Sequence, residues 1–275
     1  MGASIQSDTP VRVDREARAE YLEFACHLAR LAGEVILPRF RHRLAVENKK
    51  AGTEYDPVTE ADRAAERTMR AEILGTYPSH GVLGEEFGLE MGDGLTWVLD
   101  PIDGTRGFVM GLLHWGTLVA LFDGQRPVVG AIRQPVLDET FAGDGGRAIY
   151  RCGQEERALA TRGCQDLGWA LAGTTAPEMF RTERQVAGFD RIRRLARGMR
   201  YGTDCYLYAM LAMGLADLVI EANLKPYDVQ ALIPVVEGAG GVITDWDGGN
   251  PAMGGEVLAT GDGRLHERVL AELRA

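Results

Sequence analysis

Hydrophobic positions in the first part of the chain recur with the period of a helix. Over residues 13–40, apolar side chains return every three or four positions, which predicts an amphipathic helix that ends near Pro38. A second helix is expected from Thr59 to about Tyr77, with Thr59 as its N-cap and Asp62 three residues later, close to a capping-box pattern. The pattern thus places two helices ahead of the first series of strands.

Short apolar runs separated by glycines follow the second predicted helix. Runs of this kind are typical of strands, and the Asp123-Gly124 pair between the last two is a hairpin signal. We therefore expect residues 13–145 to form an α+β half. The predicted strands are residues 81–84, 96–100, 117–122 and 127–132.

The second half of the chain alternates between extended and helical patterns. Such alternation is typical of an α/β arrangement, so residues 146–275 are expected to form an α/β half, packed closely against the first half as one unit. Residues 1–12 are expected to be a disordered N-terminus. Predicted strands cover residues 169–172, 216–221 and 241–245, and predicted helices cover residues 177–200, 205–213, 228–239 and 265–273.

Composition restricts the class of protein. The 275 residues are 45% hydrophobic, which is enough for a large core. A formal net charge of −10 argues against nucleic acid as the main partner, because phosphate backbones are bound by clustered Lys and Arg. No run approaches ~18 uncharged apolar residues, so we expect no membrane span.

The N-terminus and the cysteines bear on localisation. The start of the chain lacks both the basic region and the long apolar run of a signal peptide. Cys26, Cys152, Cys164 and Cys205 are scattered without a CxxC pair, and we expect them to be reduced thiols. Both observations favour a cytoplasmic protein.

Acidic residues gather where predicted elements end, and one pair is set in an apolar frame. Asp100 and Asp103 follow the strand at residues 96–100, and an acid in such a frame is at least partly buried and requires a compensating charge. Magnesium prefers oxygen ligands, and the Ile102 carbonyl is free to face the same centre. The amides of Gly104 and Thr105, at the start of an expected helix, are suited to hold phosphate.

The other acidic clusters have ordinary alternatives. Asp56 and Asp62 could favour a helix N-terminus electrostatically, and Glu85 with Glu86 could belong to a solvated face. Asp228 alone is equally ambiguous. A functional interpretation of these acids therefore depends on whether they meet Asp100 and Asp103 in space.

Several segments, taken together, resemble one protein family. The segments are GEE at 84–86, WVLDPIDGT at 97–105, YD at 227–228 followed by EGAGG at 237–241, and DPVTEAD at 56–62. In this order they are similar to the signature regions of the inositol monophosphatase-like phosphatases, over residues 24–259. The resemblance implies a layered αβαβα sandwich, a phosphomonoesterase and a homodimer.

The resemblance also implies roles for individual residues. Two or three Mg²⁺ ions per active site are expected to hold the substrate phosphate and the attacking water, and the family lysine should be Lys49 or Lys50. The implied metal ligands are Glu85, Asp100, the Ile102 carbonyl, Asp103 and Asp228; Thr105 and Asp62, with Glu85, would organise and deprotonate the water; the amides of Gly104 and Thr105 would bind phosphate.

Residues of the second half point to a substrate within this family. Arg106, Thr175, Asp204 and Glu221 lie in segments that look closer to the histidinol-phosphate phosphatase branch than to inositol phosphatases, which implies a role in histidine biosynthesis. Two acids also suit a substrate with an amine and an imidazole, although they could accept hydrogen bonds from inositol hydroxyls. The alternatives are an inositol-1-phosphate phosphatase, a broad sugar- or nucleotide-phosphate hydrolase, and a non-catalytic protein-binding member of the fold.

Overall fold

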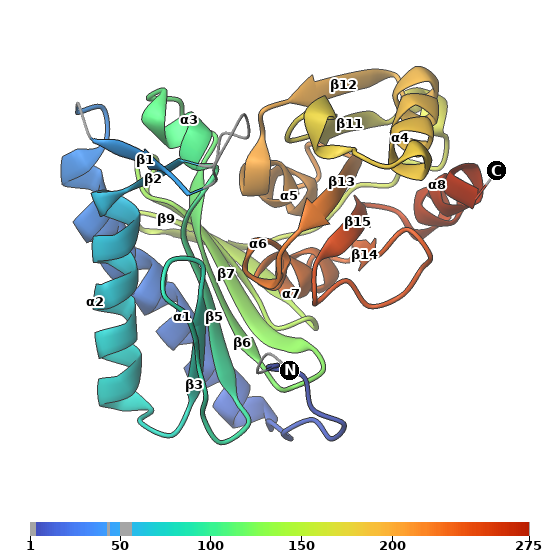
Figure 1. Ribbon diagram of the computed structural model, residues 1–275. Coiled ribbons are helices and arrows are strands. Elements are labelled where there is room, and N and C mark those ends of the chain that lie inside the picture. The colour runs from blue at the N-terminus through green and yellow to red at the C-terminus, as the bar shows by residue number, and fades with distance from the viewer. Residues whose placement is uncertain (1–3, 43–44, 50–56, 275) are drawn as a thin grey trace.

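The protein is built from five alternating layers of helices and sheets (Figure 1). The computed structural model describes residues 4–42, 45–49 and 57–274. An outer pair of helices covers an eight-stranded sheet, a middle layer of helices separates that sheet from a five-stranded one, and a second helix pair covers the far side. This arrangement confirms the predicted αβαβα sandwich.

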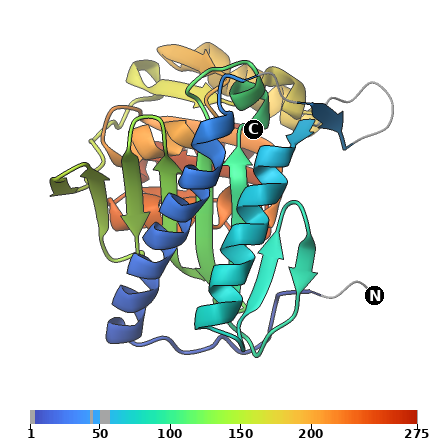
Figure 2. The ribbon, with the colours of Figure 1, turned by 90° about the vertical axis from the view of Figure 1, so that its left-hand side faces the viewer.

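The first layer consists of the two helices predicted from periodicity. Helix α1 covers Arg15–Ile36, and a single 3₁₀ turn at Leu37–Arg39 ends it where Pro38 was expected to do so. Helix α2 covers Glu60–Thr76 and begins with a complete capping box between Thr59 and Asp62. The two helices lie side by side over the large sheet (Figure 2).

The large sheet is mostly antiparallel, with strand order β10-β9-β8-β7-β6-β5-β3-β4 and one parallel pair, β3 with β5. Asp123 and Gly124 form the predicted turn between β6 and β7, where the Asp123 carboxylate accepts two backbone amides. The strands are β3 Gly81–Gly84, β4 Gly88–Glu90, β5 Thr96–Asp103, β6 Gly116–Phe122, β7 Pro127–Gln134, β8 Glu139–Gly143, β9 Ala148–Cys152 and β10 Glu155–Ala158; a separate hairpin pairs β1 Val46–Asn48 with β2 Pro57–Thr59.

The second half holds a five-stranded mixed sheet with strand order β12-β11-β13-β15-β14. Its strands are β11 Leu171–Thr174, β12 Gly198–Tyr201, β13 Leu218–Leu224, β14 Val242–Thr244 and β15 Gly255–Thr260. The outer helices are α4 Glu183–Leu195 and α8 Gly263–Arg274, and the helices between the sheets are α5 Asp204–Ala212, α6 Pro226–Val229 and α7 Leu232–Gly238.

Three apolar clusters fill the interfaces between these layers. Trp97 and Leu99 of β5 pack beneath α1 and α2, whereas Val98 of the same strand packs into the cluster between the two sheets. A third cluster, around Trp246, lies under α4 and α8. The alternation along β5 matters for the site, because it defines which side of the strand faces the second half.

Several predicted boundaries in the second half were wrong. The helix expected at 177–200 is a 3₁₀ turn (Pro177–Met179), helix α4 and strand β12, because Thr182 and Gln185 form a new capping box that restarts the chain as a helix. The helix expected at 228–239 is divided into α6 and α7, and the strand expected at 169–172 begins at Leu171. Short or weakly patterned strands, including β8, β9, β10 and β15, were not predicted.

The N-terminal segment differs from the expected disordered stretch over residues 1–12. Residues 4–12 are bound to the β6–β7 hairpin: the Ser7 amide donates to the Gly124 carbonyl and the Val11 amide to the Asp123 carbonyl, both at 2.9 Å. Ile5 is buried in the apolar cluster between the sheets. Residues 1–3 lie outside the described part of the chain.

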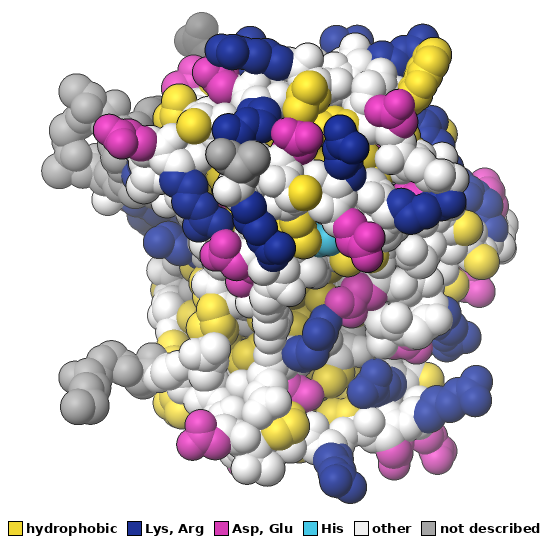
Figure 3. Space-filling model, turned by 90° about the vertical axis from the view of Figure 1, so that its right-hand side faces the viewer, with side chains coloured by type: hydrophobic (Ala, Val, Ile, Leu, Met, Phe, Trp, Pro, Cys, Tyr) yellow, Lys and Arg dark blue, Asp and Glu magenta, His cyan; other side chains and the backbone are white. Residues whose placement is uncertain are grey.

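The surface of the second half carries charges of both signs. Basic and acidic side chains are interspersed on the face shown in Figure 3. Arg184 of α4, for example, pairs with Asp247 and Glu256. No helix in the described ranges is long and apolar enough to span a membrane.

Candidate active site

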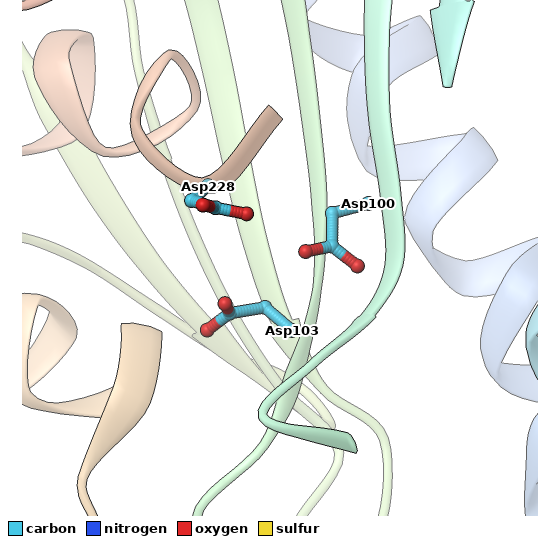
Figure 4. Close-up of side chains that lie close together, drawn as sticks. All are labelled: Asp100, Asp103 and Asp228. Carbon is cyan, nitrogen blue, oxygen red and sulfur yellow. The ribbon is translucent and has the colours of Figure 1, made fainter. Parts of the chain in front are cut away.

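Three aspartates converge at the boundary between the two halves (Figure 4). Asp100 and Asp103 lie in the C-terminal half of β5, and Asp228 lies on α6. One oxygen of each can be chosen so that all three lie within 4.8 Å of one another. Asp100 and Asp228, which are more than 120 residues apart in sequence, thus lie in one cluster, and the family resemblance implied a metal site from these residues.

A change of phase in β5 brings Asp100 and Asp103 to the same side. Val98 faces the second half and Asp100 continues that side, but Ile102 faces the helices, so the alternation is interrupted between positions 100 and 102. The register between β5 and β6 shifts at the same point. Pro101 has no amide to give to the ladder, and its carbonyl accepts instead from the Thr117 hydroxyl at 2.8 Å.

Each aspartate has one oxygen held by a backbone amide. Asp100 accepts from the Ile102 amide at 3.1 Å, Asp103 from the Cys205 amide at 2.7 Å, and Asp228 from the Lys225 amide at 2.7 Å. These bonds fix the orientation of the three carboxylates. Carboxylates can accept further bonds, so each still has capacity for a ligand.

The electrostatics of the cluster favour a bound cation. Burial raises the pKa of Asp100 well above its usual value, and the negative charges of Glu85, Asp103 and Asp228 raise it further. Burial likewise raises the pKa of Asp103, with the charge of Asp204 adding to it, and the pKa of Asp228, with Asp103 adding to it. Buried like charges that repel one another are stabilised by a hard divalent ion with oxygen ligands, and this donor set fits magnesium.

A cavity of about 750 Å³ surrounds the cluster. Every site residue predicted from the sequence lines it except Asp62. The predicted residues on its wall are Glu85, Asp100, Ile102, Asp103, Gly104, Thr105, Arg106, Thr175, Asp204, Glu221 and Asp228.

Glu85 enters the cavity from the turn after β3 and is paired with a lysine. The Lys49 ammonium lies 2.8 Å from a Glu85 oxygen and also contacts Glu86. Burial raises the pKa of Glu86 to about 7 even though Lys49 opposes the shift. Of the two lysines that fitted the sequence pattern, Lys49 therefore reaches the acids, whereas Lys50, like Asp56, lies outside the described residues.

Asp62 and Thr105 lie at the starts of two helices. Asp62 is buried and accepts from the Thr59 amide at 2.8 Å and the Thr59 hydroxyl at 2.6 Å, so it caps α2, as the alternative interpretation held. Thr105 begins α3 (Thr105–Val109), and its hydroxyl donates to the Ile102 carbonyl at 3.0 Å. Gly104 caps α3 in the left-handed region, at φ 85°.

The wall from the second half is acidic. Glu221 of β13 is buried and accepts from the Thr175 amide at 2.9 Å, the Thr175 hydroxyl at 2.5 Å and the Tyr208 hydroxyl at 3.1 Å. Burial raises the pKa of Glu221, and these donors partly offset the shift. Thr175, predicted as a substrate contact, thus also orients Glu221.

Asp204 stands beside this acid in a strained position. It has φ 42°, which is uncommon for a residue with a side chain, and burial together with the charge of Glu221 raises its pKa to about 7. Arg106, exposed at the rim, opposes that shift electrostatically.

Two contributions to the site were missed by the sequence analysis. Tyr208 is not among the predicted site residues, but its hydroxyl donates to Glu221. The Cys205 amide, which holds Asp103, belongs to the first turn of α5, where helix amides have no partner within the helix. No side-chain pattern marks a backbone donor, so only the predicted helix start could have indicated it.

Comparison with known proteins identifies the group to which this constellation belongs. Residues 17–275 match the inositol monophosphatase family. The chain belongs to this family. It is therefore a metal-dependent phosphomonoesterase that acts on a small phosphorylated molecule, and the aspartate cluster is consistent with the divalent metals that the family uses.

Relatives within the inositol monophosphatase family carry different substrate names. The chain is 39% identical to the bifunctional phosphatase IMPL2 of Arabidopsis thaliana, over 98% of this chain and 80% of that protein. It is 34% identical to a histidinol-phosphatase of Mycobacterium tuberculosis, over 92% of this chain and 98% of that protein. The structure of an inositol monophosphatase from Zymomonas mobilis superposes with a TM-score of 0.83 at 40% identity, covering 95% of this chain and all of that one.

Proposed function

We propose that this phosphomonoesterase hydrolyses L-histidinol phosphate to L-histidinol and phosphate with the help of magnesium, and that it serves histidine biosynthesis. The observation that carries the proposal is the pair of acids, Asp204 and Glu221, on the wall of the cavity that also contains the aspartate cluster. The substrate carries an amine and an imidazole, both of which present N–H donors to such acids. Similarity to named histidinol-phosphatases gives independent support.

The proposed metal site holds two or three magnesium ions. Glu85, Asp100, the Ile102 carbonyl, Asp103 and Asp228 would be the ligands, because they all line the cavity and offer only oxygen. When bound, magnesium supplies charge neutralisation and Lewis acidity at the phosphate and the attacking water.

The chain's own groups would orient the reactants. The Gly104 and Thr105 amides at the start of α3 would hold the phosphate, and the Thr105 hydroxyl would orient the water. Glu85 would accept the proton that the water loses as its oxygen bonds to phosphorus, and the alkoxide released when the ester P–O bond breaks would take up a proton to become L-histidinol. Asp62 does not line the cavity, so it would contribute to water activation only indirectly, from behind the residues that contact the water.

Asp204 and Glu221 would bind the cationic part of the substrate. A positive charge beside Asp204 would favour its ionised form, which burial and Glu221 now disfavour. Thr175 and Tyr208 hold Glu221 in place through bonds to both of its oxygens. Arg106, which carries a positive charge, would contact the phosphate end of the substrate rather than its amine.

A substrate panel tests the proposal directly. Phosphate release is measured with magnesium from histidinol phosphate, inositol 1-phosphate and an aryl phosphate, and again with a chelator. We expect the largest kcat/KM for histidinol phosphate. A larger value for inositol 1-phosphate would assign the protein to the alternative that the Zymomonas mobilis structure favours, and no turnover of any ester would refute catalysis.

Two further proposals concern assembly and compartment. The family resemblance implies a homodimer. The molar mass measured by light scattering as the protein elutes from a size-exclusion column tests this proposal. A cytoplasmic location is supported by the four cysteines, all of which are free. Fractionation of cells that express the full chain would test the location.

A further inference from the structure

The turn that carries Glu85 is held from behind by a buried acid on α2. Residues 85–87 connect β3 to β4, and Glu66 of α2 faces this turn with no exposure to solvent. One Glu66 oxygen accepts the Glu86 amide at 2.7 Å, and the other accepts the Phe87 amide at 3.2 Å. The two backbone amides that follow Glu85 in the turn are therefore both bonded by one side chain.

Arg70, one helical turn after Glu66, completes the arrangement. Its Nε donates to Glu66 at 2.8 Å, and its guanidinium also donates to the Gly88 carbonyl, where β4 begins. The charge of Arg70 compensates that of the buried carboxylate. Side chains of helix α2 thus form hydrogen bonds to two backbone amides and one backbone carbonyl of the turn.

Gly84 shows how closely the helix approaches this turn. A Cβ at position 84 would lie 1.9 Å from a Glu66 oxygen, so only glycine permits the contact. Glu66 itself does not line the cavity, which excludes it from direct contact with substrate. Its influence on the reaction can pass only through the backbone of the turn.

We propose that Glu66 is a positioning residue, which fixes the turn so that Glu85 is aimed at the aspartate cluster before any metal arrives. This inference rests on the proposed function in one respect, namely that Glu85 is a metal ligand. Partners that orient a metal ligand typically change metal affinity by about 10–100-fold when removed. The isosteric variant Glu66→Gln keeps one acceptor but turns an NH₂ group toward the second amide.

The first test measures metal binding without substrate. Magnesium is titrated against the melting temperature of the wild type and of Glu66→Gln, and we expect the half-saturating concentration to rise about 10-fold or more in the variant. Saturating magnesium should restore most of kcat, because the ligands themselves remain. An unchanged half-saturating concentration would overturn the proposal.

Asp217→Asn is the matched control. Asp217 is also buried, also pairs with an arginine (Arg162) and also accepts a backbone amide, from Leu171, but it lines a different cavity. It should lower the melting temperature and leave magnesium binding unchanged. An equal loss of magnesium binding in both variants would mean that general destabilisation, and not positioning, causes the effect.

A measurement on the wild type keeps the proposal testable even if Glu66→Gln does not fold. Hydrogen exchange of residues 84–90 is followed with and without magnesium, and we expect the amides of Glu86 and Phe87 to be protected in both conditions. Protection that arises only with magnesium would refute the proposal, because the metal and not Glu66 would then organise the turn. The magnesium titration of the melting temperature and the hydrogen exchange need no turnover, so an inactive enzyme would refute the proposed function alone.

Discussion

Replacement of Asp103 by Asn should stabilise the metal-free protein while it abolishes activity. Asp103 shares the cluster with Asp100 and Asp228, with oxygens within 4.8 Å of one another. The variant removes one charge but keeps the bond from the Cys205 amide, since the Asn oxygen can accept it. The perturbation is therefore largely electrostatic.

The magnitude follows from Coulomb's law. Two full charges about 5 Å apart repel by roughly 3 kcal/mol at an effective dielectric constant of about 20. Burial and mutual repulsion raise the pKa values of the three aspartates, which reduces the repulsion that the variant can relieve, so the net gain should be about 1–3 kcal/mol. For a chain of this size that corresponds to a melting temperature higher by about 2–4 °C for each kcal/mol.

Thermal melts in a chelator and in magnesium provide the assay. The wild type should gain stability when magnesium is added, whereas Asp103→Asn should start higher and gain less. Asp123→Asn is the control, because it also removes one negative charge and can keep the two amide bonds of its hairpin turn. A melting temperature of Asp103→Asn in chelator below that of wild type, with the control unchanged, would refute the reasoning.

Three other variants test separate parts of the structure. Glu221→Gln should raise KM for histidinol phosphate about 10-fold but hardly change KM for an aryl phosphate, and equal effects would deny Glu221 a recognition role. Gly104→Ala should reduce both kcat and stability, because position 104 has φ 85° and the new Cβ would lie 2.7 Å from the His114 carbonyl oxygen. Gly153→Ala should reduce stability alone, because position 153 is also left-handed, at φ 55°, but has open space around the new Cβ. Loss of kcat in both variants would contradict the proposed role of Gly104 in phosphate binding. His266 is buried and its pKa is lowered to about 4, so the unfolded chain binds this proton at higher pH than the native protein does. The contribution of neutral His266 to the free energy of unfolding is therefore complete above about pH 6.5 and is lost toward pH 4, by at most about 3 kcal/mol. The difference in urea midpoint between wild type and His266→Gln should show the same pH dependence.

Local features of the site were predictable from the sequence. Asp100 and Asp103 stand three residues apart in an apolar run with Pro101 between them, so burial and proximity could be inferred without any tertiary contact. The Thr59 and Asp62 capping box is equally local, and the structure contains it. Asp228 was ambiguous alone and was joined to the cluster only by the family resemblance.

Features that depend on packing were not predictable in the same way. Nothing in the pattern around Glu66 distinguishes an acid that faces a turn from one that faces solvent on an amphipathic helix. Strand β12 was hidden in a helical pattern because it lies at the sheet edge and its side chains are half-buried or exposed. The bond from Tyr208 to Glu221 likewise depends on how α5 packs against β13.

The bond from the Cys205 amide to Asp103 has a consequence for how substrate preference can diverge among relatives. Every residue except proline supplies a backbone amide, so the anchor of the reaction centre requires only that the side chain at position 205 fits the buried space that Cys205 occupies. Position 204, its neighbour, projects into the cavity from the same helical turn. Under the proposed function, a substitution at position 204 would change the wall that faces the substrate and leave the Cys205 amide in place, which makes position 204 a natural starting point for redirecting this enzyme to other phosphate esters.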